Sequence, residues 1–155
     1  MNKLWVKRAP RLPLKTPQQA LVMASIIEKE AGKNATERAR IAGVFYNRLR
    51  KGMPLQSDPT VVYALTKGAF RLRRGLTRRD LAVASPYNTY VHDGLPPKPI
   101  CRPSLASIKA ALHPESNNYL YFVANGKGGN VFAKTMFHQV KNIQRRSRYD
   151  YGKKS

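Results

Sequence analysis

The chain has 155 residues, 42% of them hydrophobic, which is enough for one domain with a buried core and too few for two comfortable ones. Its formal charge of +21 implies attraction to polyanions, namely nucleic acid, anionic membrane surfaces or anionic cell-wall polymers, without choosing among them. No apolar run approaches membrane-spanning length, and residues 1–10 lack the apolar stretch of a signal peptide.

Cysteine and histidine usage limits the possible chemistry. Cys101 is the single cysteine, which excludes an intramolecular disulfide, and no histidine is evidently paired with it for catalysis. The three histidines lack metal-ligand spacing, so neither a metal nor another cofactor is expected.

The N-terminal part predicts an arm followed by a helix. Residues 1–15 are basic and interrupted by prolines, which predicts an irregular arm or the remnant of a helix. A helix is predicted over 17–31, because Thr16 is a favourable N-cap and Pro17 suits the first helical position. Gly32 is a natural stop for this helix.

The middle of the chain predicts further helices separated by loops. Apolar residues recur at helical spacing over 35–50, and Asp58 followed by Pro59 predicts an N-cap and the start of another helix. Shorter helices are predicted over 59–66, 77–83 and 105–112. The long loop over 85–99 is rich in Pro, Tyr, Asn and Gly, and such loops often carry functional sites.

The C-terminal part predicts a β-hairpin and a basic helix. Two β-rich runs flank the glycine-rich turn at 125–129, which is a strong hairpin signal. The chain is therefore expected to be an α+β protein, mainly helical, with a hairpin near its C-terminus. The expected organisation is a basic N-terminal arm over 1–15, a domain over 16–148, whose last helix covers about 135–148, and a basic tail over 149–155.

Two carboxylates on the first long helix give the strongest functional signal, because the chain has only eight acids. At about 100° per residue, Glu30 projects among Met23, Ile26 and Ile27, whereas Glu28 lies on another flank. Apolar neighbours and the negative end of the helix dipole should raise the pKa of Glu30, which suits a general acid near neutral pH. The alternative is that one or both glutamates form ordinary surface salt bridges with the many Lys and Arg residues.

The remaining acids offer no obvious catalytic partner for Glu30. Most lie at helix starts, after a helix end or in the basic tail, and Asp93 lies in a turn. A glycosidase that uses two carboxylates would need such a partner. A mechanism with one carboxylate is therefore easier to accommodate.

Six motifs follow one another along the chain: Ala24-Ser-Ile-Ile-Glu-Lys-Glu30, Val44-Phe-Tyr-Asn-Arg-Leu49 with Gly52-Met53, Leu55-Gln-Ser-Asp-Pro-Thr60, Tyr87-Asn-Thr-Tyr90 with Gly94-Leu-Pro-Pro97, His113-Pro114, and Leu120-Tyr-Phe-Val-Ala124. In this order they resemble the endolytic murein transglycosylase (YceG-like) family. The resemblance extends over nearly all of residues 16–142.

This resemblance implies a lysozyme-like catalytic domain that cleaves the β-1,4 bond between N-acetylmuramic acid and N-acetylglucosamine within peptidoglycan strands. The product would carry a 1,6-anhydromuramic end. Glu30 matches the family's catalytic glutamate and would act first as acid and then as base, with Glu28 in a supporting or structural role. In this interpretation, polar residues of two loops hold the substrate: Gln56, Asp58, Tyr87, Asn88, Thr89 and Tyr90. The alternatives are that Asp58 only caps its helix and that the tyrosines only pack.

The resemblance also implies a location and partners. The resemblance implies that full members of the family consist of a cytoplasmic tail, a transmembrane helix, a small LysM-like domain and then this domain. The motifs of this chain match only the last. The expected site of action is the periplasmic face of the bacterial inner membrane. The expected partners are peptidoglycan strands and, by the same resemblance, the cell-wall synthesis machinery.

The sequence leaves two other functions open. One is a basic nucleic-acid-binding module, which only the charge favours, because no RNP-type, zinc-finger or helix-turn-helix motif is present. The other is a domain that binds wall glycan without cutting it.

Overall fold

The computed structural model describes the backbone of residues 1–32 and 34–154, and side chains within these ranges as far as residue 145. Within these ranges the chain forms seven α-helices, one 3-10 helix and one two-stranded antiparallel sheet, which is the α+β class expected from the sequence. The elements are α1 (Asn2–Val6), α2 (Pro17–Ala31), η1 (Ala35–Glu37), α3 (Arg38–Arg50), α4 (Asp58–Thr66), α5 (Arg78–Leu81), α6 (Leu105–Leu112), β1 (Tyr121–Ala124), β2 (Asn130–Ala133) and α7 (Met136–Lys154).

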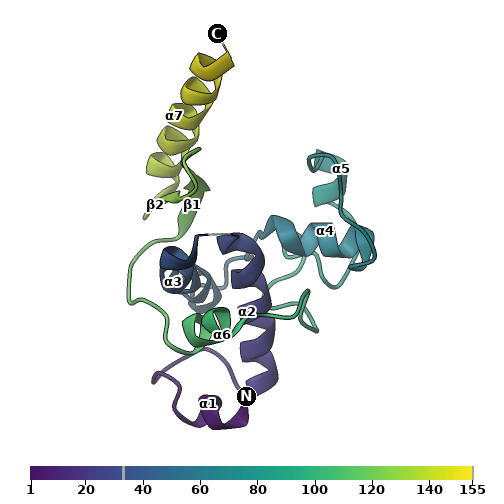
Figure 1. Cartoon of the computed structure of the whole chain (residues 1–155), viewed down its shortest axis with the longest axis vertical. Coiled ribbons are helices and arrows are strands. Elements are labelled where there is room, and N and C mark those ends of the chain that lie inside the picture. The colour runs from purple at the N-terminus through teal and green to yellow at the C-terminus, as the bar shows by residue number, and fades with distance from the viewer. Residues whose placement is uncertain (33, 155) are drawn as a thin grey trace.

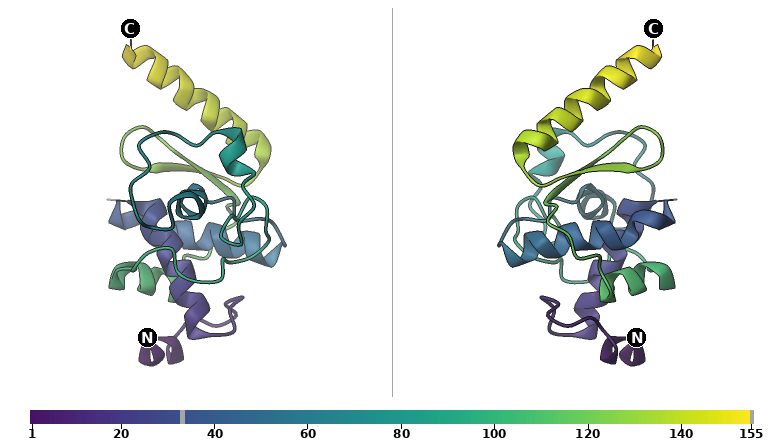
Figure 2. Two further views of the ribbon diagram at one scale, coloured as in Figure 1. Left: turned by 90° about the vertical axis from the view of Figure 1, so that its right-hand side faces the viewer. Right: turned by 90° about the vertical axis from the view of Figure 1, so that its left-hand side faces the viewer.

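The helices α2, α3 and α6 form the central body (Figure 1). Helices α4 and α5 lie to one side of this body, and α1 lies at the end opposite to the hairpin. In both side views, α7 rises away from the body at the hairpin end (Figure 2). None of the helices in the part of the chain that the structure describes is long and apolar enough to cross a membrane.

Helix α2 begins and ends where the sequence predicts. The Thr16 hydroxyl accepts a hydrogen bond from the Gln19 backbone N–H at 3.2 Å, and Pro17 is the first helical residue. Gly32 follows the last residue with a φ of +56°, a value that side-chain-bearing residues rarely adopt. The local signals therefore fix the two ends of the helix that carries Glu30.

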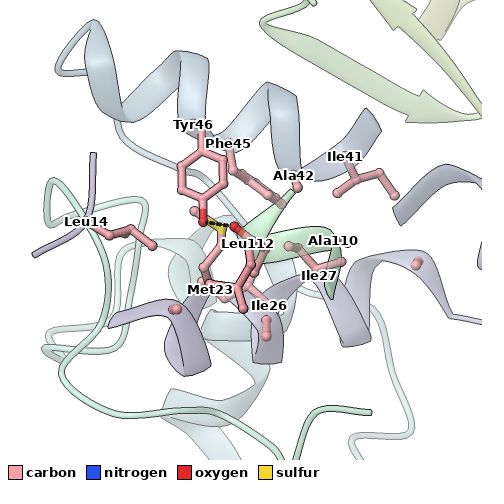
Figure 3. Close-up of a cluster of buried hydrophobic side chains, with 14 of the residues drawn as sticks. Leu14, Met23, Ile26, Ile27, Ile41, Ala42, Phe45, Tyr46, Ala110 and Leu112 are labelled. Carbon is pink, nitrogen blue, oxygen red and sulfur yellow. Dashed lines mark hydrogen bonds between the residues drawn. The ribbon is translucent and has the colours of Figure 1, made fainter. Parts of the chain in front are cut away.

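The hydrophobic core lies between α2, α3 and α6 (Figure 3). Its fully buried side chains include Met23, Ile26 and Ile27 from α2, Ile41, Phe45 and Tyr46 from α3, and Leu112 from α6. Burial of the Tyr46 ring leaves its hydroxyl needing a partner, and this hydroxyl donates a hydrogen bond to the Ala111 carbonyl at 2.5 Å. The core thereby packs α2 against its two neighbours.

Helix α3 also positions the hairpin. The segment before β1 crosses α3 closely at Gly43, where a Cβ atom would lie 2.5 Å from the Glu115 carbonyl oxygen. The Asn47 side chain then donates hydrogen bonds of 2.9 Å to the carbonyls of Asn117 and Tyr119. These contacts fix the start of β1 over the same helix that packs against α2.

The hairpin forms at the predicted place, with Phe122 opposite Phe132. The Asn125 side chain accepts hydrogen bonds from the backbone N–H groups of Lys127 and Gly129, which closes the turn. The Phe122 ring also meets the Phe45 ring edge-on, with 5.8 Å between centroids. One face of the hairpin is therefore joined to the core.

Some boundaries differ from the sequence prediction. The helix predicted over 35–50 is divided into η1 and α3. Helix α7 continues past the predicted end at 148, to Lys154. In the arm over 1–15, α1 packs the side chains of Leu4 and Trp5 against the core.

The N-cap of α4 was predicted one residue too late. Ser57 is the N-cap, and Asp58 is the first helical residue. The Asp58 carboxylate does not cap the helix, because it accepts a hydrogen bond from the Tyr90 hydroxyl instead. The shift leaves Asp58 available for a different role.

Candidate active site

A cavity of about 340 Å³ opens where α2, α3, α4 and the hairpin meet. Four of the residues predicted for the site line it together: Glu30, Gln56, Asp58 and Tyr90. The rest of the lining comes from Phe45, Arg48, Leu55, Asn130, Gln139 and the segment 120–124. Residues far apart in the sequence therefore line one cavity, from the last turn of α2 to the first turn of α7.

Glu30 points its carboxyl group into an environment that disfavours charge. Burial, and secondly the negative charge of Asp58, raise the pKa of Glu30 to about 8, and the Ser57 hydroxyl opposes this rise. None of the ion pairs between side chains that the structure describes involves Glu30. Glu30 is therefore mostly protonated at neutral pH, as expected of a general acid.

Glu28 lies in the opposite kind of environment, although it is only two residues away. Its carboxylate accepts hydrogen bonds from the Ser104 backbone N–H at 2.7 Å and from the Ser107 hydroxyl at 2.9 Å. It also pairs with Arg38 at 3.6 Å. The hydrogen bonds from Ser104, with those from Ser107 and the charge of Arg38, lower the pKa of Glu28 against the opposing effect of burial. Glu28 is thus an ionised link between α2 and the N-terminus of α6, outside the cavity lining.

Asp58 and Tyr90 form a pair beside Glu30. The Tyr90 hydroxyl donates a hydrogen bond to Asp58 Oδ1. Burial, this hydrogen bond and the nearby acids raise the pKa of Tyr90, so its hydroxyl keeps its proton. The pair places one negative charge and one oriented hydroxyl in the wall of the cavity.

The segment that carries Gln56 and Asp58 has a special backbone. Gln56 has a φ of +50°, in the left-handed region that residues other than glycine rarely adopt. Thr89 holds this segment in place: its carbonyl accepts from the Gln56 N–H at 3.2 Å, and its hydroxyl accepts from the Ser57 N–H at 2.9 Å. The same hydroxyl lies 2.8 Å from that of Thr60. Thr89 is therefore an internal support of the cavity wall.

Asn88 supports the other loop in a similar way. Its side chain is completely buried, and it donates to the carbonyls of Leu81 and Val83 at 3.0 and 2.9 Å. Its side-chain oxygen accepts a hydrogen bond from the Tyr90 backbone N–H at 2.8 Å. Asn88 thus fixes the position of the residue that binds Asp58.

Tyr87 packs its ring against Tyr63, with 4.7 Å between the ring centroids. It does not line the cavity, and neither do Asn88 and Thr89. The structure therefore divides the predicted substrate-binding residues into two groups. Gln56, Asp58 and Tyr90 lie in the wall, and the other three lie behind it.

Arg48 also lines the cavity, although it is not among the residues predicted for the site. Its side chain donates hydrogen bonds to the carbonyls of Leu120 at 2.7 Å and Pro54 at 2.8 Å, and the residue is only 8% exposed. Burial lowers its pKa, although an arginine remains charged. The sequence contains one sign of this role, because Arg48 lies within the apolar stripe of the helix predicted over 35–50.

One buried polar atom of the cavity lining has no hydrogen-bond partner in the described part of the chain. It is the side-chain oxygen of Gln139. Gln139 donates its side-chain N–H to the Phe122 carbonyl at 3.1 Å, which orients the free oxygen. Unpaired buried polar atoms are rare, and a polar ligand in the cavity would satisfy this one. No sequence pattern marks Gln139, because α7 reaches the cavity only through the fold.

Comparisons with known proteins identify the family of the chain. The model of the YceG-like family matches residues 1–145. Over 116 residues the chain is 52% identical to a protein of Bacillus subtilis named endolytic murein transglycosylase, which covers 75% of this chain and 31% of that protein. A protein of Streptococcus pneumoniae with the same name is 40% identical over 120 residues, which is 76% of this chain and 21% of that protein.

A solved structure of a YceG-like protein from Listeria monocytogenes has the same fold. It is 51% identical, with a TM-score of 0.73, over 80% of this chain and 39% of that one. The chain thus spans less than a third of the length of the curated relatives it matches. The family match over most of its length shows that the chain belongs to the YceG-like family.

Proposed function

We propose that this chain is the catalytic domain of an endolytic peptidoglycan transglycosylase. It would cleave the β-1,4 bond between N-acetylmuramic acid and N-acetylglucosamine within glycan strands and leave a 1,6-anhydromuramic end. The observation that carries this proposal is the carboxyl group of Glu30, which lies without an ion pair among the described side chains in a polar cavity and has a pKa of about 8. The names of the curated relatives support the same activity.

In the first step, the protonated Glu30 carboxyl donates its proton to the glycosidic oxygen, and the bond from this oxygen to the muramic C1 breaks. The N-acetylglucosamine end leaves as an alcohol. The oxygen of the muramic N-acetyl group stabilises the positive charge that develops at C1. The negative charge of Asp58 beside Glu30 favours the protonated state that this step needs.

In the second step, the ionised Glu30 carboxylate takes the proton from the C6 hydroxyl of the same muramic residue. The C6 oxygen attacks C1 and closes the 1,6-anhydro ring. Glu30 is thereby reprotonated, and the proton balance closes without water. One carboxylate serves both steps. This agrees with the cavity lining, in which Glu30 is the glutamate with a raised pKa.

The other cavity residues would hold the sugar. Gln56, Asp58 and Tyr90 lie in the wall and are proposed to contact it directly. The free oxygen of Gln139 is suited to accept a hydrogen bond from a sugar hydroxyl or the acetamido N–H. Tyr87, Asn88 and Thr89 are proposed to act through the loops that they support, and Glu28 through its link to α6.

This activity would be exerted where peptidoglycan lies, outside the cytoplasmic membrane. A position at the periplasmic face of the inner membrane and a role beside the cell-wall synthesis machinery stay predictions of the family resemblance. Both concern the longer proteins to which the chain is related.

Product analysis tests the proposed reaction. Purified peptidoglycan is incubated with the protein, with Glu30→Gln, and with Glu115→Gln as a control that removes an acid in an exposed ion pair with Arg40. Mass spectrometry should detect anhydromuramic ends from the parent and the control, and none from Glu30→Gln. Reducing muramic ends would identify a hydrolase instead, and binding without any cleavage would favour a glycan-binding domain.

A further inference from the structure

A second and larger cavity, of about 690 Å³, adjoins the first. Asp58 lines both cavities, and the second extends along α4 and the segment that follows it. Lys29 also lines the second cavity, although it directly precedes Glu30 on α2. Because successive helical residues project about 100° apart, α2 presents a carboxyl group to one cavity and an ammonium group to the next.

The walls of this second cavity combine apolar surface with positive charge. Val62, Tyr63 and Phe70 supply the apolar part, and Phe70 is 63% exposed. Three cations line the same space: Lys29, Arg71 and Arg74. Such a lining suits a ligand that carries both carboxylates and small apolar groups.

Two of these cations are not neutralised by the protein. Arg74 pairs with Asp80 at 2.5 Å, which fixes the start of α5. In contrast, none of the ion pairs found between described side chains involves Lys29 or Arg71. The one acid in the lining, Asp58, is already bound by the Tyr90 hydroxyl. The cavity therefore has an excess of positive charge.

We propose that this second cavity binds the stem peptide of the muramic acid residue whose bond is cleaved, with Lys29 and Arg71 on its carboxylates. The inference rests on the proposed function, since it concerns the same substrate. In peptidoglycan the stem peptide is attached through the lactyl group of muramic acid, and it carries free carboxylates and alanine methyl groups. A muramic residue beside Glu30 would have to direct this substituent out of the first cavity, and the shared wall at Asp58 leads to the second.

The test compares binding of soluble glycan strands with and without stem peptides, prepared with and without treatment by an amidase. All binding is measured in a Glu30→Gln background, so that no strand is cut. The variant pair Lys29→Gln and Arg71→Gln removes the two unpaired cations. The control pair Arg78→Gln and Arg79→Gln removes the same charge from α5, outside the cavity lining.

With Lys29 and Arg71 intact, the Glu30→Gln protein should bind stem-bearing strands at least about tenfold more tightly than bare strands. This ratio corresponds to about 1.4 kcal/mol. The Lys29→Gln, Arg71→Gln pair should bind both kinds of strand alike, while the control pair keeps the preference. The charge-preserving pair Lys29→Arg and Arg71→Lys should keep most of it. Two results would overturn the inference. One is equal binding of the two kinds of strand when Lys29 and Arg71 are intact, and the other is the same loss of preference in the control pair as in the Lys29→Gln, Arg71→Gln pair.

The outcome is separate from that of the proposed reaction. Absence of anhydromuramic ends from the parent protein would reject the transglycosylase activity, whatever the binding data show. Anhydromuramic ends together with a stem preference that survives the Lys29→Gln, Arg71→Gln pair would leave the activity standing and reject the second cavity as the stem site.

Discussion

The Tyr90 hydroxyl donates a hydrogen bond to the Asp58 carboxylate, across 32 positions of sequence. This contact joins the loop after α5 to the first turn of α4, and it holds a negative charge in the wall that also contains Glu30. The charge of Asp58 is the second cause, after burial, of the raised pKa of Glu30. The charge of Asp58 therefore helps to keep the Glu30 carboxyl group protonated.

Asp58→Asn should shift the pH dependence of strand cleavage. Removal of the negative charge lowers the pKa of Glu30, while burial still keeps it above the ordinary value of 4.5. The alkaline limb of kcat/KM, expected near pH 8 in the parent, should therefore move to lower pH. Asp93→Asn, which changes an exposed acid outside the cavity, should leave the limb in place. An unmoved limb in Asp58→Asn would contradict this electrostatic role.

Glu30→Gln should stabilise the fold more at alkaline than at acidic pH. The folded-state pKa is raised from 4.5 to about 8, so between these values the folded chain holds a proton that the unfolded chain has released. The stability of the parent therefore falls as the pH rises through this window. Glutamine has no proton to lose, so the free energy of unfolding of Glu30→Gln relative to the parent should grow by on the order of 4 kcal/mol between pH 5 and pH 9. Urea unfolding at the two pH values measures this, and a constant difference would argue against the raised pKa.

Glu28→Ala should destabilise the fold by about 2–3 kcal/mol at neutral pH. The change leaves the Ser104 N–H and the Ser107 hydroxyl without their acceptor, and Arg38 without its ion-pair partner. Because the pKa of Glu28 is lowered, its contribution is present above its ordinary value of 4.5 and is lost as the pH falls below it. Glu115→Ala removes a partly exposed ion pair with Arg40 and one hydrogen bond from the Asn117 side chain, which keeps its bond to the Arg40 carbonyl, so it should cost less than Glu28→Ala, about 1 kcal/mol. Equal costs in urea unfolding would refute the assigned role.

Thr89→Val should impair both stability and cleavage. Valine has nearly the same shape but lacks the hydroxyl that accepts from the Ser57 N–H, so a buried donor loses its partner at a cost of about 1–3 kcal/mol. The strained segment at Gln56 then loses an anchor, and kcat should fall. Thr89→Ser keeps the hydroxyl and should restore most of kcat. Full activity in Thr89→Val would show that the anchor is not needed.

Local signals predicted much of the fold and part of the candidate site. Caps and stop residues placed α2, and β-rich runs around a glycine-rich turn placed the hairpin. These features depend on neighbours within a few positions of the chain. A single sequence contains such information directly. The helical position of Glu30 predicted the direction of its pKa shift, although the charge of Asp58, its second cause, comes from a distant part of the chain.

Features that depend on distant contacts were not predictable in this way. The Asp-Pro pair at 58–59 is typical of an N-cap, and only the contact with Tyr90 shows that the Asp58 side chain serves elsewhere. Arg48 and Gln139 reach the cavity from α3 and α7, which no local pattern relates. The support of the cavity wall by Thr89 likewise depends on the Ser57 N–H, which lies 32 positions away in the chain.

Glu30, and not its neighbour Glu28, is proposed to perform the chemistry. This assignment is tested by kcat on purified glycan strands for Glu30→Gln and Glu28→Gln, each first shown to be folded by its thermal transition. Glu30→Gln should lose at least about 10²-fold to 10⁴-fold in kcat, the usual contribution of a general acid, whereas Glu28→Gln should stay within about tenfold of the parent. A folded Glu30→Gln variant with parental kcat, or an equal loss in a folded Glu28→Gln variant, would contradict the assignment.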